Sequence, residues 1–219
     1  MDHRSPWLTI WTQPKATIMQ IVAHNPNQGL WWLASIYGFC SLMNLFQSMY
    51  MGMQFGIGAI LIFAIILAPI WGYISFSVWS AFVTWTGKWL KGQGHFKAVR
   101  AAYAWSCVPL FVNIPLWILM VILLGQQLFM NNLPSETPGA RVTAMFLILV
   151  AKVVLAIWSL VIYLNALASV QHFSVLKAIG NVILAGVVVS ILSFVVWQVM
   201  GYVMDGQTVA SLFLMNFFQ

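Results

Sequence analysis

The sequence has 219 residues, of which 62% are hydrophobic and only 5% are charged, and its formal net charge is +6. Soluble domains carry about a quarter of charged residues, so this composition excludes an ordinary water-soluble globule and makes lipid the solvent for most of the chain. The positive charge reflects three acids against nine bases. Because a nucleic-acid binder needs a dense basic surface, no nucleic-acid partner is expected.

A short helix is predicted near the start of the chain, within an N-terminal cytoplasmic or interfacial segment over residues 1–28. Pro14 suits the first turn of a helix, and Asn25 before Pro26 ends it. Ile18 and Ile21 fall on one face. Such an amphipathic helix is expected either at the headgroup boundary of a bilayer or docked on the protein's own cytoplasmic face. The first residues do not have the form of a secretory signal peptide.

Five apolar segments follow, each near the ~20 residues that cross a bilayer. They cover residues 30–51, 57–85, 102–128, 142–168 and 176–203. Only helices or closed barrels satisfy the backbone in lipid, and the long apolar runs exclude the ~10-residue alternation of barrel strands. The predicted fold class is all-α: a polytopic membrane helix bundle with five transmembrane helices over 29–204, plus short interfacial helices at both ends, the second in a non-cytoplasmic tail over 205–219.

Basic residues orient the chain. Arg4, Lys15, Lys88, Lys91, Lys97, Arg100 and Lys177 fall on one side of the predicted spans, and Arg141, in the loop over residues 131–141, falls on the other. Because Lys and Arg concentrate in cytoplasmic loops, the N-terminus is expected in the cytoplasm and the C-terminus outside. The residues Lys88, Lys91, Lys97, Arg100 and Lys177 are expected to form a cytoplasmic basic rim that attracts anionic headgroups, at ~1 kcal/mol per residue.

Lys152 is the least expected residue in the predicted spans. It lies ten residues into the fourth span, about 15 Å deep at 1.5 Å per residue, where a cation costs at least ~2.5–3.5 kcal/mol unless it finds water or a partner. By depth, its neighbours are expected among Asn44, Gln47, Tyr73 and Ser193, and Ser159 and Tyr163 continue its own helical face. Two interpretations stay open: an intramembrane site for an anion or a lipid phosphate, or a lysine that extends along its stem to carbonyls or water.

Three prolines are predicted to kink the spans. Pro69, Pro109 and Pro115 each remove a helical hydrogen bond, which makes them candidates for hinges, although prolines are common in membrane helices. No carboxylate pair and no Cys/His spacing typical of metal sites occurs. The sequence therefore predicts no catalysis, no metal and no cofactor.

The chain resembles the bacterial branch of the YIP (Ypt/Rab-interacting protein) domain family over residues 7 to about 203. Three stretches carry the resemblance: PWLTIWTQPKATIMQIVAHNP; WLKGQGHFKAVRAAYAWSCVPLF, with Tyr103, Ser106 and Pro109; and NALASVQHFSVLKAIGNVIL, with Lys177 and Ala178. The resemblance implies a five-span membrane protein with a cytoplasmic N-terminus. Eukaryotic relatives work in Golgi and early secretory membranes and bind prenylated Rab-type GTPases. Because this chain lacks the long hydrophilic N-terminal region of those relatives, a prokaryotic inner membrane is the expected location.

Two functions are compatible with these observations. The first is a non-enzymatic inner-membrane protein that organises lipids or partner membrane proteins, other copies of itself included. The alternative is a transporter, channel or lipid translocator that uses Lys152 as an anion or headgroup site. A hydrated cavity at Lys152 would favour the alternative, and a dry interior would favour the first.

Overall fold

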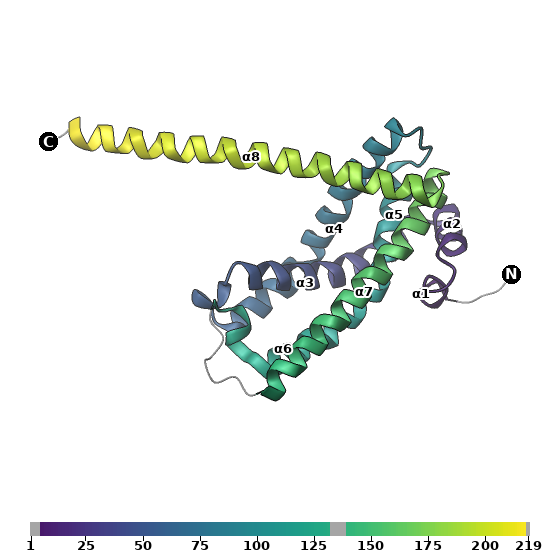
Figure 1. Ribbon diagram of the computed structural model, residues 1–219, viewed down its shortest axis with the longest axis horizontal. Helices are drawn as coiled ribbons and strands as arrows, with labels where there is room; N and C mark the ends of the chain where they lie inside the picture. Colours follow the sequence, from purple (N-terminus) through teal and green to yellow (C-terminus); the bar gives the residue numbers. More distant parts are fainter. Residues whose placement is uncertain (1–4, 132–138, 218–219) are drawn as a thin grey trace.

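The computed structural model describes the backbone of residues 5–131 and 139–217 and the side chains of the same ranges up to residue 202. Its elements are helical throughout these ranges, which confirms the all-α class (Figure 1). In chain order they are α1 (Pro6–Thr9), α2 (Pro14–His24), α3 (Leu30–Ser48), η1 (Met51–Met53), α4 (Ile57–Trp89), α5 (Phe96–Ser106), η2 (Val108–Val112), α6 (Asn113–Leu124), η3 (Gly125–Phe129), α7 (Gly139–Gln171) and α8 (Val175–Phe217), where η marks a 3-10 helix. Residues 132–138 of the predicted outer loop lie outside the described part.

Helix α2 has the bounds that the sequence predicts, from Pro14 to His24. Its apolar face is buried: Thr17, Ile18 and Ile21 are all less than one-tenth exposed. The helix packs against α5 and α7. Docking on the protein's own helices therefore accounts for its amphipathic face.

Helices α3 and α4 form an antiparallel pair that is held close by small residues. Ala34 and Gly38 on α3 face Ala68 and Gly72 on α4, and a Cβ atom added at either glycine would collide with a backbone carbonyl of the other helix. Small residues at this spacing allow the backbones of membrane helices to approach closely. Helix α4 continues through Pro69 without ending.

The third predicted span is broken. Helix α5 ends at Ser106, the 3-10 helix η2 follows with Pro109, and α6 begins at Asn113 with Pro115 in its first turn. Proline removes a helical donor and clashes with the preceding turn, so the two prolines account for the break. The predicted kink in this segment is confirmed, and it changes the face that α6 presents.

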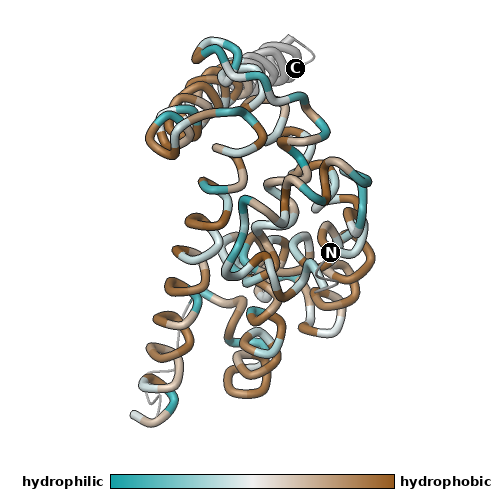
Figure 2. Tube along the Cα trace, turned by 90° about the vertical axis from the view of Figure 1, so that its right-hand side faces the viewer, coloured by the Kyte–Doolittle hydropathy of each residue, from teal (hydrophilic) through white to brown (hydrophobic). Residues whose placement is uncertain are grey.

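Four segments are long and apolar enough to cross a membrane among the described residues: Ile57–Trp89, Phe96–Phe129, Gly139–Gln171 and Val175–Tyr202. They correspond to the second to fifth predicted spans. Helix α3, with 19 residues, reaches about 28 Å at 1.5 Å per residue. Its mean hydropathy is lower than that of the four segments, so it is not among them. Figure 2 shows hydrophobic residues along most turns of the long helices, and α4 exposes Ile62, Ile65, Ile66 and Ile70, as expected of a surface that faces lipid.

Helix α8 departs from the prediction at its C-terminal end. The sequence predicts a span that stops near residue 203 and a separate short helix, but α8 is one continuous helix of 43 residues from Val175 to Phe217. No proline follows Pro138 in the sequence, so nothing with a strong helix-breaking preference interrupts it. Only its first part packs on α4 and α7, and Figure 1 shows the rest extending away from the other helices.

The buried side chains form two clusters. The first joins α2, α5 and the C-terminal part of α7, with Ile18, Val99, Trp105, Ile162 and Leu167 among its members. The second joins α3, the start of α4, α6 and η3, with Met43, Ile60, Trp117 and Phe129 among its members. The candidate site lies where these two clusters meet.

Candidate functional site

Lys152 lies in a pocket of about 420 Å³ between α3, the broken third segment and α7. Its polar lining comes from Tyr37, Cys40, Ser41 and Asn44 on α3, from Asn113 and Trp117 on α6, and from Lys152 itself. The Nζ atom of Lys152 lies 3.7 Å from the centroid of the Trp117 ring. A cation over an indole face is attracted by the ring quadrupole, so Trp117 partly compensates the ammonium group for lost hydration.

Two residues that line the pocket each have a buried polar atom without a hydrogen-bond partner among the described residues. These atoms are the Nε1 atom of Trp117 and the Oδ1 atom of Asn113. Trp117 is 1% exposed. An unsatisfied buried donor or acceptor costs about 1–3 kcal/mol, so a group that pairs with these atoms would stabilise the site.

The break in the third segment positions two residues of the pocket. Asn113 is the first residue of α6, directly after η2, and Trp117 follows one turn later. The carbonyl of Ser106, at the end of α5, accepts a hydrogen bond of 2.7 Å from the Ser159 hydroxyl of α7. The break is therefore held against α7, and it turns Asn113 and Trp117 toward Lys152.

A layer of aromatic side chains lies beside the pocket, on the side that leads along α7 to Gln171. The Tyr103 ring contacts the rings of Tyr37, Phe76 and Tyr163 at centroid distances of 6.1, 5.4 and 5.1 Å. The Tyr37 and Tyr103 hydroxyls lie 3.3 Å apart, and the indole of Trp79 donates to the Tyr163 hydroxyl at 3.1 Å. These rings separate the pocket from the basic end of the molecule.

The structure brings only some of the predicted neighbours of Lys152 together. Asn44 lines the same pocket, and Ser159 and Tyr163 line an adjoining pocket of about 190 Å³ that shares Tyr37, Leu110 and Ala156 with it. Gln47 is half-buried on α3 outside the described lining of either pocket. The predicted depth in the bilayer was enough to place Asn44 near Lys152. Depth does not specify whether a side chain reaches the pocket, and Gln47 is not part of its lining.

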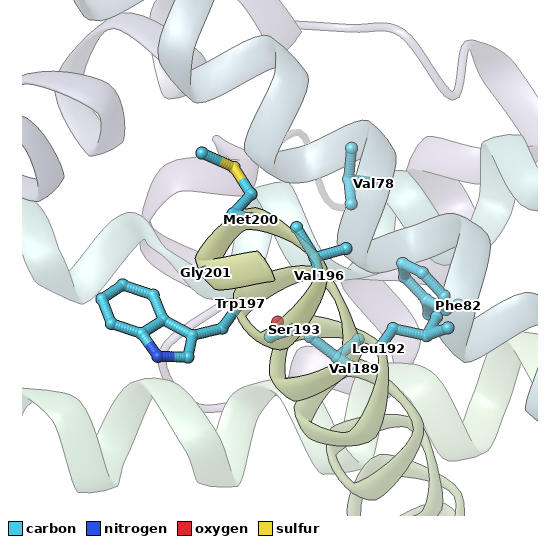
Figure 3. A pocket seen from close by; sticks show the side chains of 9 residues that line it. All are labelled: Val78, Phe82, Val189, Leu192, Ser193, Val196, Trp197, Met200 and Gly201. Atoms are coloured by element: carbon cyan, nitrogen blue, oxygen red, sulfur yellow. The ribbon is translucent and has the colours of Figure 1, made fainter. Parts of the chain in front are cut away.

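Tyr73 and Ser193 lie elsewhere. The Tyr73 hydroxyl accepts a hydrogen bond from Arg100. Ser193 lines a pocket of about 630 Å³ between α4 and α8, where Figure 3 shows it among apolar side chains that include Val78, Phe82 and Trp197. Ser193 is not brought to Lys152 because α8 leaves the other helices.

Four residues of the predicted basic rim are exposed at one end of the molecule: Lys88, Lys91, Lys97 and Lys177. Lys88 lies at the end of α4, Lys91 in the turn that follows and Lys97 at the start of α5. This turn is fastened to the end of α7, because the Gln93 amide donates to the Gln171 carbonyl at 3.2 Å, and α8 starts four residues further on. Trp85 and Trp89 are half-exposed and contact each other at 4.9 Å, as expected of interfacial anchors.

The prediction that Arg100 belongs to the exposed basic rim is wrong, because the Arg100 side chain is buried. It is 6% exposed and donates hydrogen bonds to Tyr73 Oη at 3.0 Å, Ser77 Oγ at 3.4 Å and Asn27 Oδ1 at 2.9 Å. Its guanidinium also lies 5.0 Å from the Phe96 ring centroid. Lys97, three residues earlier on α5, is exposed, so two positive residues one turn apart have different environments.

Sequence reasoning missed the role of Gln171. This side chain is 1% exposed, and its Oε1 atom accepts a hydrogen bond from the Gly94 amide at 3.1 Å. A Cβ atom added at Gly87 or Gly92 would collide with the Gln171 side chain, and one added at Gly94 would collide with the backbone carbonyl of the preceding residue, Val170. The glycines of this loop therefore make room for a side chain of α7. Their unusual number in so short a stretch is the sequence feature that could have indicated a close contact here.

Asn181 was also missed. It is fully buried at the start of α8, where it accepts from the Thr86 hydroxyl at 2.7 Å and donates to the Val83 carbonyl at 3.1 Å. These bonds join α8 to the end of α4. They fix the helix that carries Lys177 beside the end of α4, which carries Lys88 and leads into the turn with Lys91.

Long apolar helices around a lysine-containing pocket define a multi-pass α-helical membrane protein. The Yip1 domain matches residues 8–206, so the chain belongs to the Yip1 domain family. This family is linked to membrane trafficking, and its members are generally non-enzymatic. No curated protein and no solved structure matches the chain.

Proposed function

We propose that this protein is a bacterial-type member of the Yip1 family that organises anionic lipids and partner membrane proteins in the inner membrane. It crosses the bilayer five times, with α3 as the first span, its N-terminus in the cytoplasm and its C-terminus outside. It acts by binding and not by catalysis. Other copies of the chain are among the partners that this function allows.

One observation carries the proposal: Lys88, Lys91, Lys97 and Lys177 are exposed together at one end of the molecule, beside Trp85 and Trp89. We call these four lysines the lysine rim. Basic groups next to a membrane surface attract anionic lipid at ~1 kcal/mol each. Lys and Arg also concentrate on the cytoplasmic side of membrane proteins, so the rim supports both the lipid interaction and the orientation.

Extraction of the protein from membranes in native lipid discs tests the lipid interaction. The wild-type discs are expected to contain more anionic phospholipid than the bulk membrane, and a variant with all four rim lysines changed to glutamine is expected to lose most of this enrichment. A variant with Lys15→Gln is the matched control, since it removes one basic residue outside the rim. Equal lipid composition for wild type and rim variant would contradict the proposal.

Labelling of single cysteines tests the topology. The two natural cysteines, Cys40 and Cys107, are buried, and alanine at both positions gives a background without thiols. A cysteine at Lys15, which precedes α3 and is exposed, is expected to be accessible only from the cytoplasm, and one at Gln54, in the turn between α3 and α4, only from outside. Labelling of both from one side would exclude α3 as a span.

The second candidate function, translocation of a lipid or anion, is supported by the pocket at Lys152. The aromatic layer of Tyr37, Phe76, Tyr103 and Tyr163 lies between this pocket and the lysine rim, so translocation needs that layer to open. A flux assay in proteoliposomes tests it. Transport that is lost in Lys152→Met and kept in the rim variant would favour this second function over the first.

A further inference from the structure

We propose that the Lys152 pocket is a binding site for the anionic headgroup of one phospholipid, which enters sideways from the bilayer between α3 and α7. The chemistry that fits is a phosphate diester whose headgroup also carries a hydroxyl. The inference deepens the proposed lipid-organising function, on which it rests for its membrane setting. It concerns a site separate from the lysine rim.

The described residues supply no carboxylate partner for the charge in the pocket. The three acids of the sequence are Asp2, Glu136 and Asp205, and none belongs to α3, η2, α6 or α7. The π face of Trp117 is the contact that the structure gives to the ammonium group. Ionisable groups within membranes are paired or face a cavity, and an anionic ligand would provide the missing pair.

The mouth of the pocket faces lipid. Helices α3 and α7 are not packed against each other here, and η2 and α6 join them from behind. On the α7 side the lining includes Leu149 and Val153, whose side chains are 57% and 49% exposed. Exposed apolar residues on a membrane helix contact acyl chains, so a ligand reaches Lys152 most directly as part of an amphiphile.

The polar atoms of the pocket match a hydroxylated phosphate headgroup. Lys152 can donate to phosphate oxygens, and charge-assisted hydrogen bonds of this kind are the strong ones. The Nε1–H of Trp117 is buried and unpartnered, and it becomes a second donor when the indole ring turns toward the ligand. The unpartnered Oδ1 of Asn113 accepts from a hydroxyl. Asn44 also offers an oxygen, because its Nδ2 already donates to the Cys40 carbonyl at 2.8 Å.

The size of the pocket agrees with this ligand. Its volume of about 420 Å³ falls within the ~300–1,000 Å³ that is typical of small-molecule sites. The acyl chains would leave through the lateral mouth, along Leu149 and Val153. The pocket therefore needs to enclose only the headgroup.

Native mass spectrometry and thermal unfolding of the full-length protein in neutral detergent test the proposal. The probes are phosphatidylglycerol, phosphatidylcholine and inorganic phosphate. Wild type is expected to retain one phosphatidylglycerol and to be stabilised by it, with little response to the other two. An equal response to phosphatidylcholine would overturn the role of charge, and an equal response to inorganic phosphate would show a site for free anions and overturn the lipid assignment.

Three variants locate the site. Lys152→Met is expected to weaken phosphatidylglycerol retention about 10- to 100-fold, and Trp117→Phe, which keeps an aromatic ring and removes the N–H, about 3- to 10-fold, as befits the loss of one charge-assisted hydrogen bond. Lys15→Met, on α2 outside both the lysine rim and the pocket, is expected to change nothing. Unchanged retention in Lys152→Met overturns the proposal. If Lys152→Met does not fold, unchanged phosphatidylglycerol retention in Trp117→Phe overturns the proposal instead.

The two lipid proposals fail in different ways. If the rim variant keeps its bulk anionic enrichment while Lys152→Met loses its retained lipid, the proposed function of the rim is wrong and the pocket is correct. If the rim variant loses its enrichment while Lys152→Met still retains the lipid, the reverse holds.

Discussion

The ammonium group of Lys152 on α7 lies 3.7 Å from the centroid of the Trp117 ring on α6. The contact joins two helices across a pocket, and Trp117 is available for it because α6 starts anew after the break at η2. Among the described residues, the lysine is therefore held by an aromatic face and not by a carboxylate. A contact of this kind leaves the ammonium hydrogens available for an anion.

The first prediction concerns the stability cost of this lysine. In neutral detergent without anionic lipid, Lys152→Met is expected to raise the unfolding temperature or leave it unchanged, because a buried charge without a partner is replaced by an apolar side chain of similar length. Thermal unfolding followed by circular dichroism measures this. Lys97→Met is the control for loss of a single positive charge. A clear loss of stability in Lys152→Met alone would mean that the chain itself satisfies the ammonium group.

The second prediction concerns the crossing of α3 and α4. Gly72→Ala is expected to destabilise the protein by about 1–3 kcal/mol or more, because its Cβ collides with the backbone of Ala34. Gly186→Ala on α8, with open space around it, is expected to be neutral or stabilising, by up to ~1 kcal/mol from helix propensity. Opposite signs for the two substitutions in a thermal unfolding series confirm the crossing, and equal effects contradict it.

The third prediction concerns the buried guanidinium. Arg100→Gln is expected to destabilise by about 3 kcal/mol or more, because it leaves Tyr73, Ser77 and Asn27 without a shared donor. Tyr73→Phe removes one of these acceptors and is expected to cost about 1–3 kcal/mol. Lys97→Gln, three residues earlier on the exposed face, is expected to have no measurable effect. Similar unfolding temperatures for Arg100→Gln and Lys97→Gln would refute the burial of Arg100.

The fourth prediction concerns the glycine loop. Gln171→Ala is expected to speed hydrogen exchange of backbone amides over residues 92–95, because the Gly94 amide loses its acceptor. Gly92→Ala is expected to have a similar effect through a collision with the Gln171 side chain. The control is Gln93→Ala, since the Gln93 side chain is exposed and its backbone donor is kept. Exchange rates that match wild type in Gln171→Ala would show that this side chain does not hold the loop.

Much of the fold follows from periodicity and composition. The apolar runs predicted the long helices, and the prolines predicted both the start of α2 and the break in the third segment. The continuity of α8 beyond residue 203 was not predicted, because the tail is too short to span a bilayer and was assigned to a separate interfacial helix. Hydropathy indicates how long a lipid-exposed segment is. It carries little information on whether the helix ends at the edge of that segment or continues beyond it.

The candidate site was predictable only in part, because depth fixes the level of a residue and not its direction. Lys152 and Asn44 were found at the same level and do share a pocket. Asn113 and Trp117 were missed because the 3-10 turn before them changes the face of α6. Arg100 was assigned to the surface by its charge, whereas its neighbours Ala98, Val99, Ala101 and Ala102 are all buried and could have indicated an inward position.

The environment of Arg100 also bears on how the chain is made. All three of its hydrogen-bond acceptors, Asn27, Tyr73 and Ser77, precede it in the sequence. During synthesis from the N-terminus, the ribosome has therefore delivered every acceptor before the arginine emerges. The third segment brings a cation that opposes its own entry into lipid, and the groups that receive it are already present on α4 and in the turn before α3.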